Sequence, residues 1–131
     1  MKLGIHRFAV WSNLFYLVPI VLALYFHLAL VAFIVLLLFL LSSAFHVLGE
    51  REFIRLDVAI ATTVVMVNVL LLYFSEFNSR FLPAVLALTV IAFGIRFIIE
   101  RGDRGGTAHG FWHLIAAAIT SLCLLSYALP F

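Results

Sequence analysis

The sequence has few of the charged residues with which a water-soluble domain covers its surface. Of its 131 residues, 11% are charged, whereas 66% are hydrophobic. A soluble domain of this length needs far more polar surface, so we expect nearly all of residues 1–131 to lie in lipid as a single domain. The alternating pattern of β-barrel strands is absent, and helices satisfy their own backbone groups in lipid. The composition therefore predicts an all-α transmembrane bundle.

Several familiar motifs are also missing. The single cysteine, Cys123, excludes an intrachain disulfide, and its apolar surroundings predict a packing residue. The glycine-rich stretch 101–106 lacks the Lys-Ser/Thr ending of a nucleotide-binding P-loop, so we expect it to be a connector. The first apolar run is not followed by a small-x-small cleavage site, which favours a retained helix over a signal peptide. The sequence offers no support for nucleic-acid binding.

Five long apolar stretches are separated by short polar breaks. They cover residues 8–26, 28–48, 53–74, 81–99 and 108–129. Each contains roughly 19–22 residues, which at about 1.5 Å per residue is enough to cross a hydrocarbon core about 30 Å thick. The break near residues 25–27 is the least distinct. We therefore predict five transmembrane helices.

The basic residues indicate how these helices are oriented. In a five-helix arrangement, Arg80 lies alone on one side of the membrane. The other side holds Lys2, Arg7, Arg51, Arg55, Arg96, Arg101 and Arg104. Positive charge collects on the cytoplasmic side, so the N-terminus is expected in the cytoplasm and the C-terminus outside. The segregation also supports five helices, because merging or splitting one would scramble it.

Four ionisable residues are predicted to lie at one depth near the cytoplasmic face. His46 is about one turn inside the end of the second expected helix, and Asp57 is about one turn inside the start of the third. His109 and His113 occupy the first two turns of the fifth. Ionisable groups are costly at membrane depth, so these residues are functional candidates.

Their spacing is typical of a metal site. His109 and His113 are four residues apart, so they share a helix face and can bind one ion. With His46, they would form a three-histidine zinc site whose fourth position holds water. Asp57 would hold or deprotonate that water, and Ser42, one turn deeper than His46, would hydrogen-bond the water or the substrate. The alternatives are a metal-free hydrogen-bond network and, for Ser42, a bond to its own helix.

These residues resemble the signature of a known family. The segment Ser42-Ser-Ala-Phe-His46, then Asp57 eleven residues later, then His109-Gly-Phe-Trp-His113, is similar to the Ser-x-x-x-His, Asp and His-x-x-x-His pattern of the CREST superfamily. Its members include alkaline ceramidases, adiponectin and progestin receptors, GPI-remodelling phospholipases and myomaker-like proteins. The resemblance implies that the three histidines bind zinc, while Asp57 and Ser42 act on the zinc-bound water.

The resemblance also implies a function and a departure from the family. It predicts a zinc-dependent intramembrane lipid hydrolase, either ceramidase-like on an amide or phospholipase-like on an ester. A non-catalytic, zinc-stabilised membrane protein that senses lipid or remodels membranes is the alternative. The family usually has seven helices, and this chain lacks a pair of them, which preserves the side from which the last histidines enter. We expect a second subunit in a homo-oligomer, or bound lipid, to complete the pocket wall.

Overall fold

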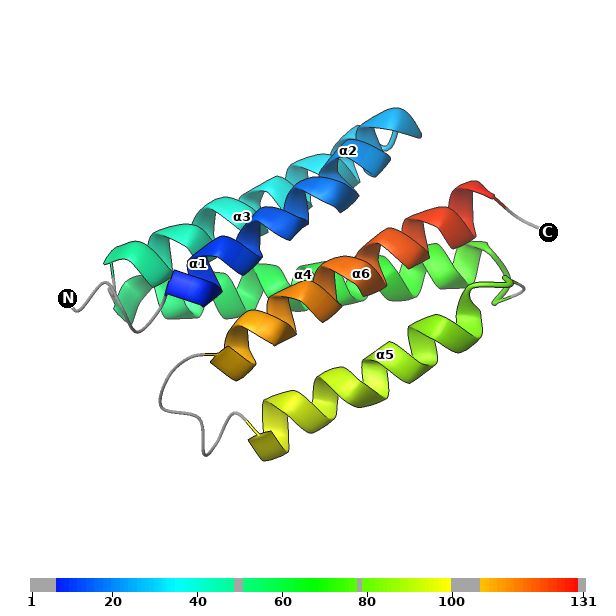
Figure 1. The fold of residues 1–131 in the computed structure, drawn as a ribbon. Helices are drawn as coiled ribbons and strands as arrows, with labels where there is room; N and C mark the ends of the chain where they lie inside the picture. The colour runs from blue at the N-terminus through cyan, green and yellow to red at the C-terminus, as the bar shows by residue number, and fades with distance from the viewer. Residues whose placement is uncertain (1–6, 49–50, 78, 100–106, 130–131) are drawn as a thin grey trace.

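The computed structural model describes residues 7–48, 51–77, 79–99 and 107–129, without the side chains of residues 7, 51–54 and 57. These described residues form five helical rods and no strand (Figure 1), so the all-α prediction is confirmed. The ends of the rods differ by only a few residues from the apolar stretches in the sequence. Long apolar runs become helices because each backbone N–H and C=O then finds a partner within its own segment.

The rods have the following bounds. The first consists of α1 (Arg7–Asn13), a 3-10 turn η1 (Leu14–Tyr16) and α2 (Leu17–Tyr25). The next two are α3 (Ala29–Leu48) and α4 (Arg51–Phe74). The last two are α5 (Leu82–Gly94), which continues as a π-helical segment η2 (Ile95–Ile99), and α6 (Thr107–Ala128).

Within the described residues, four rods are long and apolar enough to cross a membrane. They are Phe8–Tyr25, Ala29–Leu48, Leu82–Ile99 and Thr107–Ala128. The apolar part of α4 is shorter, Val58–Phe74, because charged residues occupy the first two turns of that helix. Most outward-facing side chains are large and apolar, such as Trp11 and Leu30. These features are those of a membrane protein.

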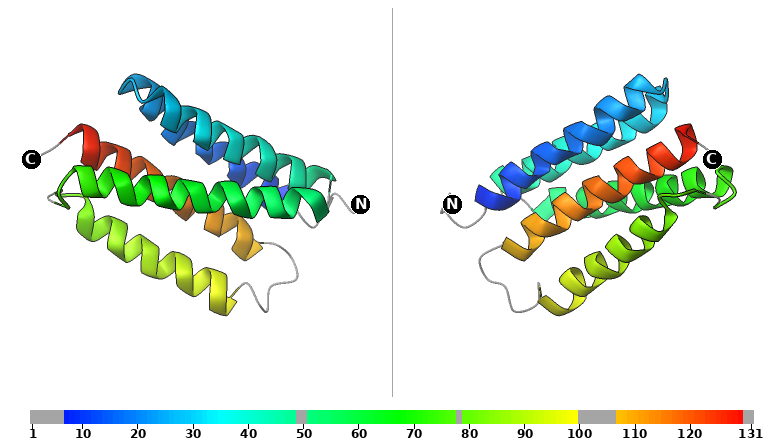
Figure 2. Two further views of the ribbon diagram at one scale, coloured as in Figure 1. Left: turned by 180° about the vertical axis from the view of Figure 1, so that it is seen from behind. Right: turned by 45° about the vertical axis from the view of Figure 1, so that its right-hand side comes forward.

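The central helix of the bundle is α6, which packs against α1, α2, α4 and α5. The two views of Figure 2 show α5 on one side of α6 and the first rod on the other. Helices α4 and α6 run in the same direction, whereas α3 and α5 run in the opposite direction. The end of the bundle at which α1, α4 and α6 begin and α3 ends is called the histidine end below.

The turn after α2, at the opposite end, reverses the chain without a glycine. The N–H of Leu28 donates to the carbonyl of Ala23 at 2.8 Å, and the N–H of His27 donates to that of Leu24 at 3.0 Å. This is a Schellman motif, in which the left-handed residue is usually glycine. Here His27 takes that conformation with φ 61°, and Glu76 repeats it after α4 with φ 57°. The missing glycine explains why this break is indistinct in the sequence.

The 3-10 turn in the first rod, Leu14–Tyr16, lies three to five residues before Pro19. Proline has no N–H, and its ring crowds the carbonyl four residues earlier, which belongs to Phe15. The short segment Leu14–Tyr16 relieves this conflict by changing from α to 3-10 hydrogen bonding. The irregular turn comes directly after Ser12 and Asn13, two buried polar residues that take part in the site described below.

Two clusters of buried side chains hold the rods together. The cluster nearer the histidine end contains Tyr16, Ile20, Val35, Leu38, Val64 and Ala117. The other contains Ala23, Ala32, Leu71, Leu72, Val85, Cys123 and Leu124. The thiol of Cys123 is completely buried in the second cluster, in agreement with the packing role expected from its apolar surroundings.

Candidate metal centre

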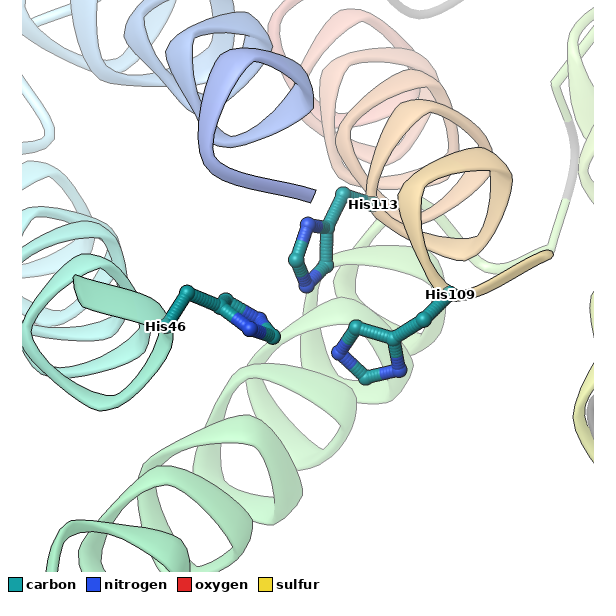
Figure 3. Close-up of side chains that lie close together, drawn as sticks. All are labelled: His46, His109 and His113. Carbon is teal, nitrogen blue, oxygen red and sulfur yellow. The ribbon is translucent and has the colours of Figure 1, made fainter. Parts of the chain in front are cut away.

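Three histidines converge at the histidine end of the bundle. His46 lies in the last turn of α3, and His109 and His113 lie in the first two turns of α6. Figure 3 shows their rings pointing toward one another from these two helices. The ring nitrogens that they can offer to an ion all lie within 4.8 Å of one another. The structure therefore brings together the three histidines that the sequence places at one depth.

The three rings form a compact and largely buried group. The centroid of the His46 ring is 4.9 Å from that of His109 and 5.1 Å from that of His113, and the latter two are 4.5 Å apart. His46 is 6% exposed and His113 is 3% exposed, whereas His109 is half-buried. The Nε2 atoms of His46 and His109 are shielded from solvent. Imidazole nitrogens thus lie close together in a largely buried site.

Helix α1 determines which nitrogen of His113 carries the proton. Nδ1 of His113 lies 3.1 Å from the carbonyl oxygen of Ala9 and 3.0 Å from Oγ of Ser12. The Ser12 hydroxyl itself donates to the same carbonyl at 2.9 Å. A carbonyl oxygen only accepts, so Nδ1 must be the donor, and it donates to both oxygens. The lone pair of His113 is then on Nε2, the form in which a histidine binds metal while its other nitrogen is held by the protein.

A transition metal fits this group of ligands. In a tetrahedral zinc site with bonds of about 2.0–2.1 Å, the ligand nitrogens are about 3.3 Å apart. The histidine nitrogens all lie within 4.8 Å of one another, so the group is compatible with such an ion. Three histidine ligands that leave a fourth position open are typical of catalytic zinc sites, whereas structural sites are closed by four protein ligands.

Ser42 is buried one turn from His46 and has a partner on another helix. Its hydroxyl donates to Oδ1 of Asn13 in α1 at 3.3 Å. The hydroxyl thus reaches a second helix, whereas the alternative considered from the sequence was a bond to its own helix. This contact connects α3 to α1 directly beside the histidines.

Asp57 belongs to the second turn of α4, and its side chain lies outside the described part of the structure. The depth of its backbone follows from the helices. Nδ2 of Asn68 on α4 donates to Oγ1 of Thr120 on α6 at 3.1 Å. Asn68 and Thr120 come eleven residues after Asp57 and His109, respectively, on helices that run in the same direction. The backbone of Asp57 therefore lies at about the depth of His109.

A cavity of about 510 Å³ lies between α4, α5 and α6. His109 and Arg96 line it at the histidine end, Asn68 and Thr120 line it further along, and Cys123 lines it toward the opposite end. Between His109 and Cys123 the cavity follows α6 for about 21 Å, at 1.5 Å per residue. Its other walls are mostly aliphatic, and its volume lies within the usual range of about 300–1,000 Å³ for ligand pockets. An apolar cavity thus begins beside one of the three histidines.

Sequence reasoning missed three residues that shape the site, namely Ser12, Asn13 and Gly110. The first two are adjacent polar residues within an apolar run, and polar groups at membrane depth are functional candidates by default. Gly110 lies between the two histidines of α6, where a Cβ atom would overlap the ring of Phe8 in α1. Its role depends on which helix is adjacent, and the sequence carries no signal of that.

Comparisons with protein-family models, curated proteins and solved structures find no match to this chain. The features of this chain that bear on function are the histidine cluster, the adjoining cavity and the apolar helices that contain them.

Proposed function

We propose that this chain is a shortened CREST-like protein that hydrolyses a membrane lipid with the help of a zinc ion. The observation that carries the proposal is the largely buried cluster of His46, His109 and His113, of which His109 also lines an apolar cavity. Zinc bound there would polarise the scissile carbonyl and activate a water molecule. The three histidines would hold the ion.

Two further residues are assigned to the attacking water. Asp57, on α4 at the depth of His109, would accept its proton and return that proton to the leaving group. Ser42 donates its own proton to Asn13, so its oxygen would accept a hydrogen bond from the water and orient it. Hydrolysis of an amide or an ester needs this proton transfer, because the attacking water must lose a proton and the leaving group must gain one.

The cavity indicates the substrate class. It is lined by aliphatic side chains and begins at His109, so the hydrocarbon chain of a lipid would lie along α6 with its polar end at the histidines. A site one or two turns below the interface matches the depth of an amide or ester bond just under a lipid headgroup. Ceramide-like amides and phospholipid-like esters are the two candidate substrates.

The same proposal includes a topology. Seven basic residues on one side against one on the other favour a multi-pass protein with a cytoplasmic N-terminus and the metal site near the cytoplasmic face. The cavity is open between α4 and α5, where lining residues such as Val65 and Phe93 are exposed. Surrounding lipid or a second copy of the chain would complete its wall on that side.

The decisive experiment combines metal analysis with a lipid panel. Protein purified in mild detergent should contain about one zinc ion per chain. It should cleave lipid amides or lipid esters, lose this activity with a chelator and regain it with zinc. A His113→Ala protein purified in the same way controls for contaminating hydrolases. Absence of bound metal would contradict the proposal, whereas bound metal without cleavage of any lipid would favour the non-catalytic, zinc-stabilised alternative.

A further inference from the structure

Helix α1 supplies none of the three histidines, yet it lies between the two helices that do. It packs against both α3 and α6. Its residues Ser12 and Asn13 are consecutive, so their side chains leave the helix about 100° apart and reach different neighbours. Ser12 contacts His113 on α6, and Asn13 contacts Ser42 on α3. One pair of residues on α1 therefore bridges the two ligand-bearing helices.

The contact of Asn13 with α3 involves both ends of its carboxamide. Oδ1 accepts a hydrogen bond from Ser42, and Nδ2 donates one to Oγ of Ser43, each at 3.3 Å. The two serines lie about one turn before His46, so Asn13 holds the part of α3 that carries this histidine. Asn13 has no exposed surface, and Ser12 is 1% exposed. A buried polar group without a hydrogen-bond partner destabilises the folded state. The bridge therefore favours the one arrangement of the helices in which these groups are paired.

The close approach of α1 to α6 depends on a glycine. The ring of Phe8 lies where a Cβ atom of residue 110 would be, and it also contacts Phe111 with a centroid separation of 5.2 Å. One turn further along α1, Ser12 contacts His113. After another turn, Tyr16 packs against the same imidazole, with the two ring centroids 6.0 Å apart. Phe8, Ser12 and Tyr16 are four residues apart and share one face. This face is complementary to the start of α6.

We infer that α1 is a positioning element of the metal site, with Ser12 holding the ring of His113 and Asn13 holding the turn before His46. Neither residue belongs to the group of side chains that would hold the ion. The inference rests on the metal site proposed above and extends it to a helix outside the ligand set. Partners that fix the outer nitrogen of a metal-binding histidine typically change metal affinity by about 10–100-fold.

The test compares two serine substitutions in the intact protein. Ser12→Ala removes the hydroxyl that accepts from His113. Ser121→Ala is the matched control, because the Ser121 hydroxyl donates to the carbonyl of Ala117 in its own helix, at 2.8 Å, and not to a histidine. Affinity for cobalt(II), followed by its visible absorption, and for zinc by competition, should fall about 10–100-fold in Ser12→Ala. It should stay at the unmutated value in Ser121→Ala.

The outcomes distinguish the inference from the proposed function. Failure of the unmutated protein to bind cobalt or zinc would contradict the metal site itself. Binding by the unmutated protein with the same affinity in Ser12→Ala would overturn only the positioning role. A change in thermal stability that leaves affinity and the cobalt spectrum of the folded protein unaltered would also overturn it, because a purely structural contact behaves in that way.

A measurement without mutation decides the matter if Ser12→Ala fails to fold. Histidine side chains labelled with ¹⁵N report by NMR which ring nitrogen is protonated. In the metal-free protein, the proton of His113 should be on Nδ1 and protected from exchange with water by Ser12 and Ala9. On addition of zinc, the Nε2 resonance should shift and the Nδ1 proton should remain. A proton on Nε2 would overturn the inference, because α1 would then hold the ring in the form that cannot bind the ion.

Discussion

The two helices that flank α6 differ in how they pack. The span Phe8–Tyr25 has 39% of its residues buried, whereas Leu82–Ile99 has 11%. On the α1 side, Ser12 contacts His113 of α6, and Gly110 of α6 allows the ring of Phe8 to lie close to its backbone. On the α5 side, a cavity remains between the helices. Both spans are apolar, so their hydrophobicity does not account for the difference in buried share. Small and polar residues account for it, because they allow helices in lipid to pack tightly.

The histidine pair of α6 lies at the boundary between these two regions. His113 faces the tightly packed side, where Ser12 and Ala9 hold its ring. His109 lines the cavity on the open side. The proposed metal site therefore joins a tightly packed region, which would maintain its geometry, to an open region, which would admit a lipid. Substitutions on each side can show whether the two sides have these separate roles.

The largest expected effect is loss of the metal when a histidine from either region is removed. His109→Ala on the open side and His113→Ala on the packed side should each leave two nitrogen ligands and abolish stoichiometric zinc binding. Elemental analysis of the purified variants measures this directly. His27→Ala, in the turn at the opposite end, is the control and should retain zinc. Zinc retained at the unmutated level in His109→Ala would remove the open side from the site.

The second-largest expected effect is on the rate of lipid hydrolysis, and it tests whether Asp57 on α4 takes part in the reaction. Asp57→Asn should keep the metal but lower the rate of lipid hydrolysis by about 10²–10⁴-fold, because an amide cannot accept the proton of the attacking water. The rate is measured on the lipid identified from the panel, and zinc content is measured in parallel. Loss of zinc would make Asp57 a fourth ligand and favour a structural site. An unchanged rate would remove Asp57 from the mechanism.

A pair of glycine substitutions compares the packing on the two sides. Gly110→Ala places a methyl group against the ring of Phe8 and should destabilise the bundle by about 1–3 kcal/mol. Gly94→Ala, at the end of α5, meets no atom within 4 Å and should change stability by less than about 0.5 kcal/mol, or raise it slightly. Unfolding in detergent measures both. Equal effects would show that α1 and α5 pack alike, contrary to the structure.

The smallest effect concerns the polar contact within the cavity wall. Asn68 donates to Thr120 across α4 and α6, and its Oδ1 atom has no hydrogen-bond partner among the described residues. A double-mutant cycle of Asn68→Leu and Thr120→Val should give a coupling of about 0.6 kcal/mol, the average for such contacts in membranes. A coupling near zero would mean that this pair does not help to align α4 with α6.

The sequence predicted the three clustered histidines better than the residues that surround them. His46, His109 and His113 could be placed at one depth because distance along a helix is proportional to residue number. Ser42 could be placed near His46 for the same reason. Its contact with Asn13 could not be foreseen, because it depends on which face of α1 meets α3. In lipid both the inner and outer faces of a helix are apolar, so hydrophobic periodicity says little about that face.

The sequence by itself determined the number of rods, their approximate ends and the shared depth of the three histidines. Its apolar runs leave the backbone no hydrogen-bond partners except its own, and that constraint acts on each segment separately. Only the tertiary structure decided that α1 lies against Gly110 and His113, that α5 stands apart from α4, and that a cavity begins at His109. Those features depend on the lateral order and rotation of the helices, which are set by contacts between side chains far apart in the chain.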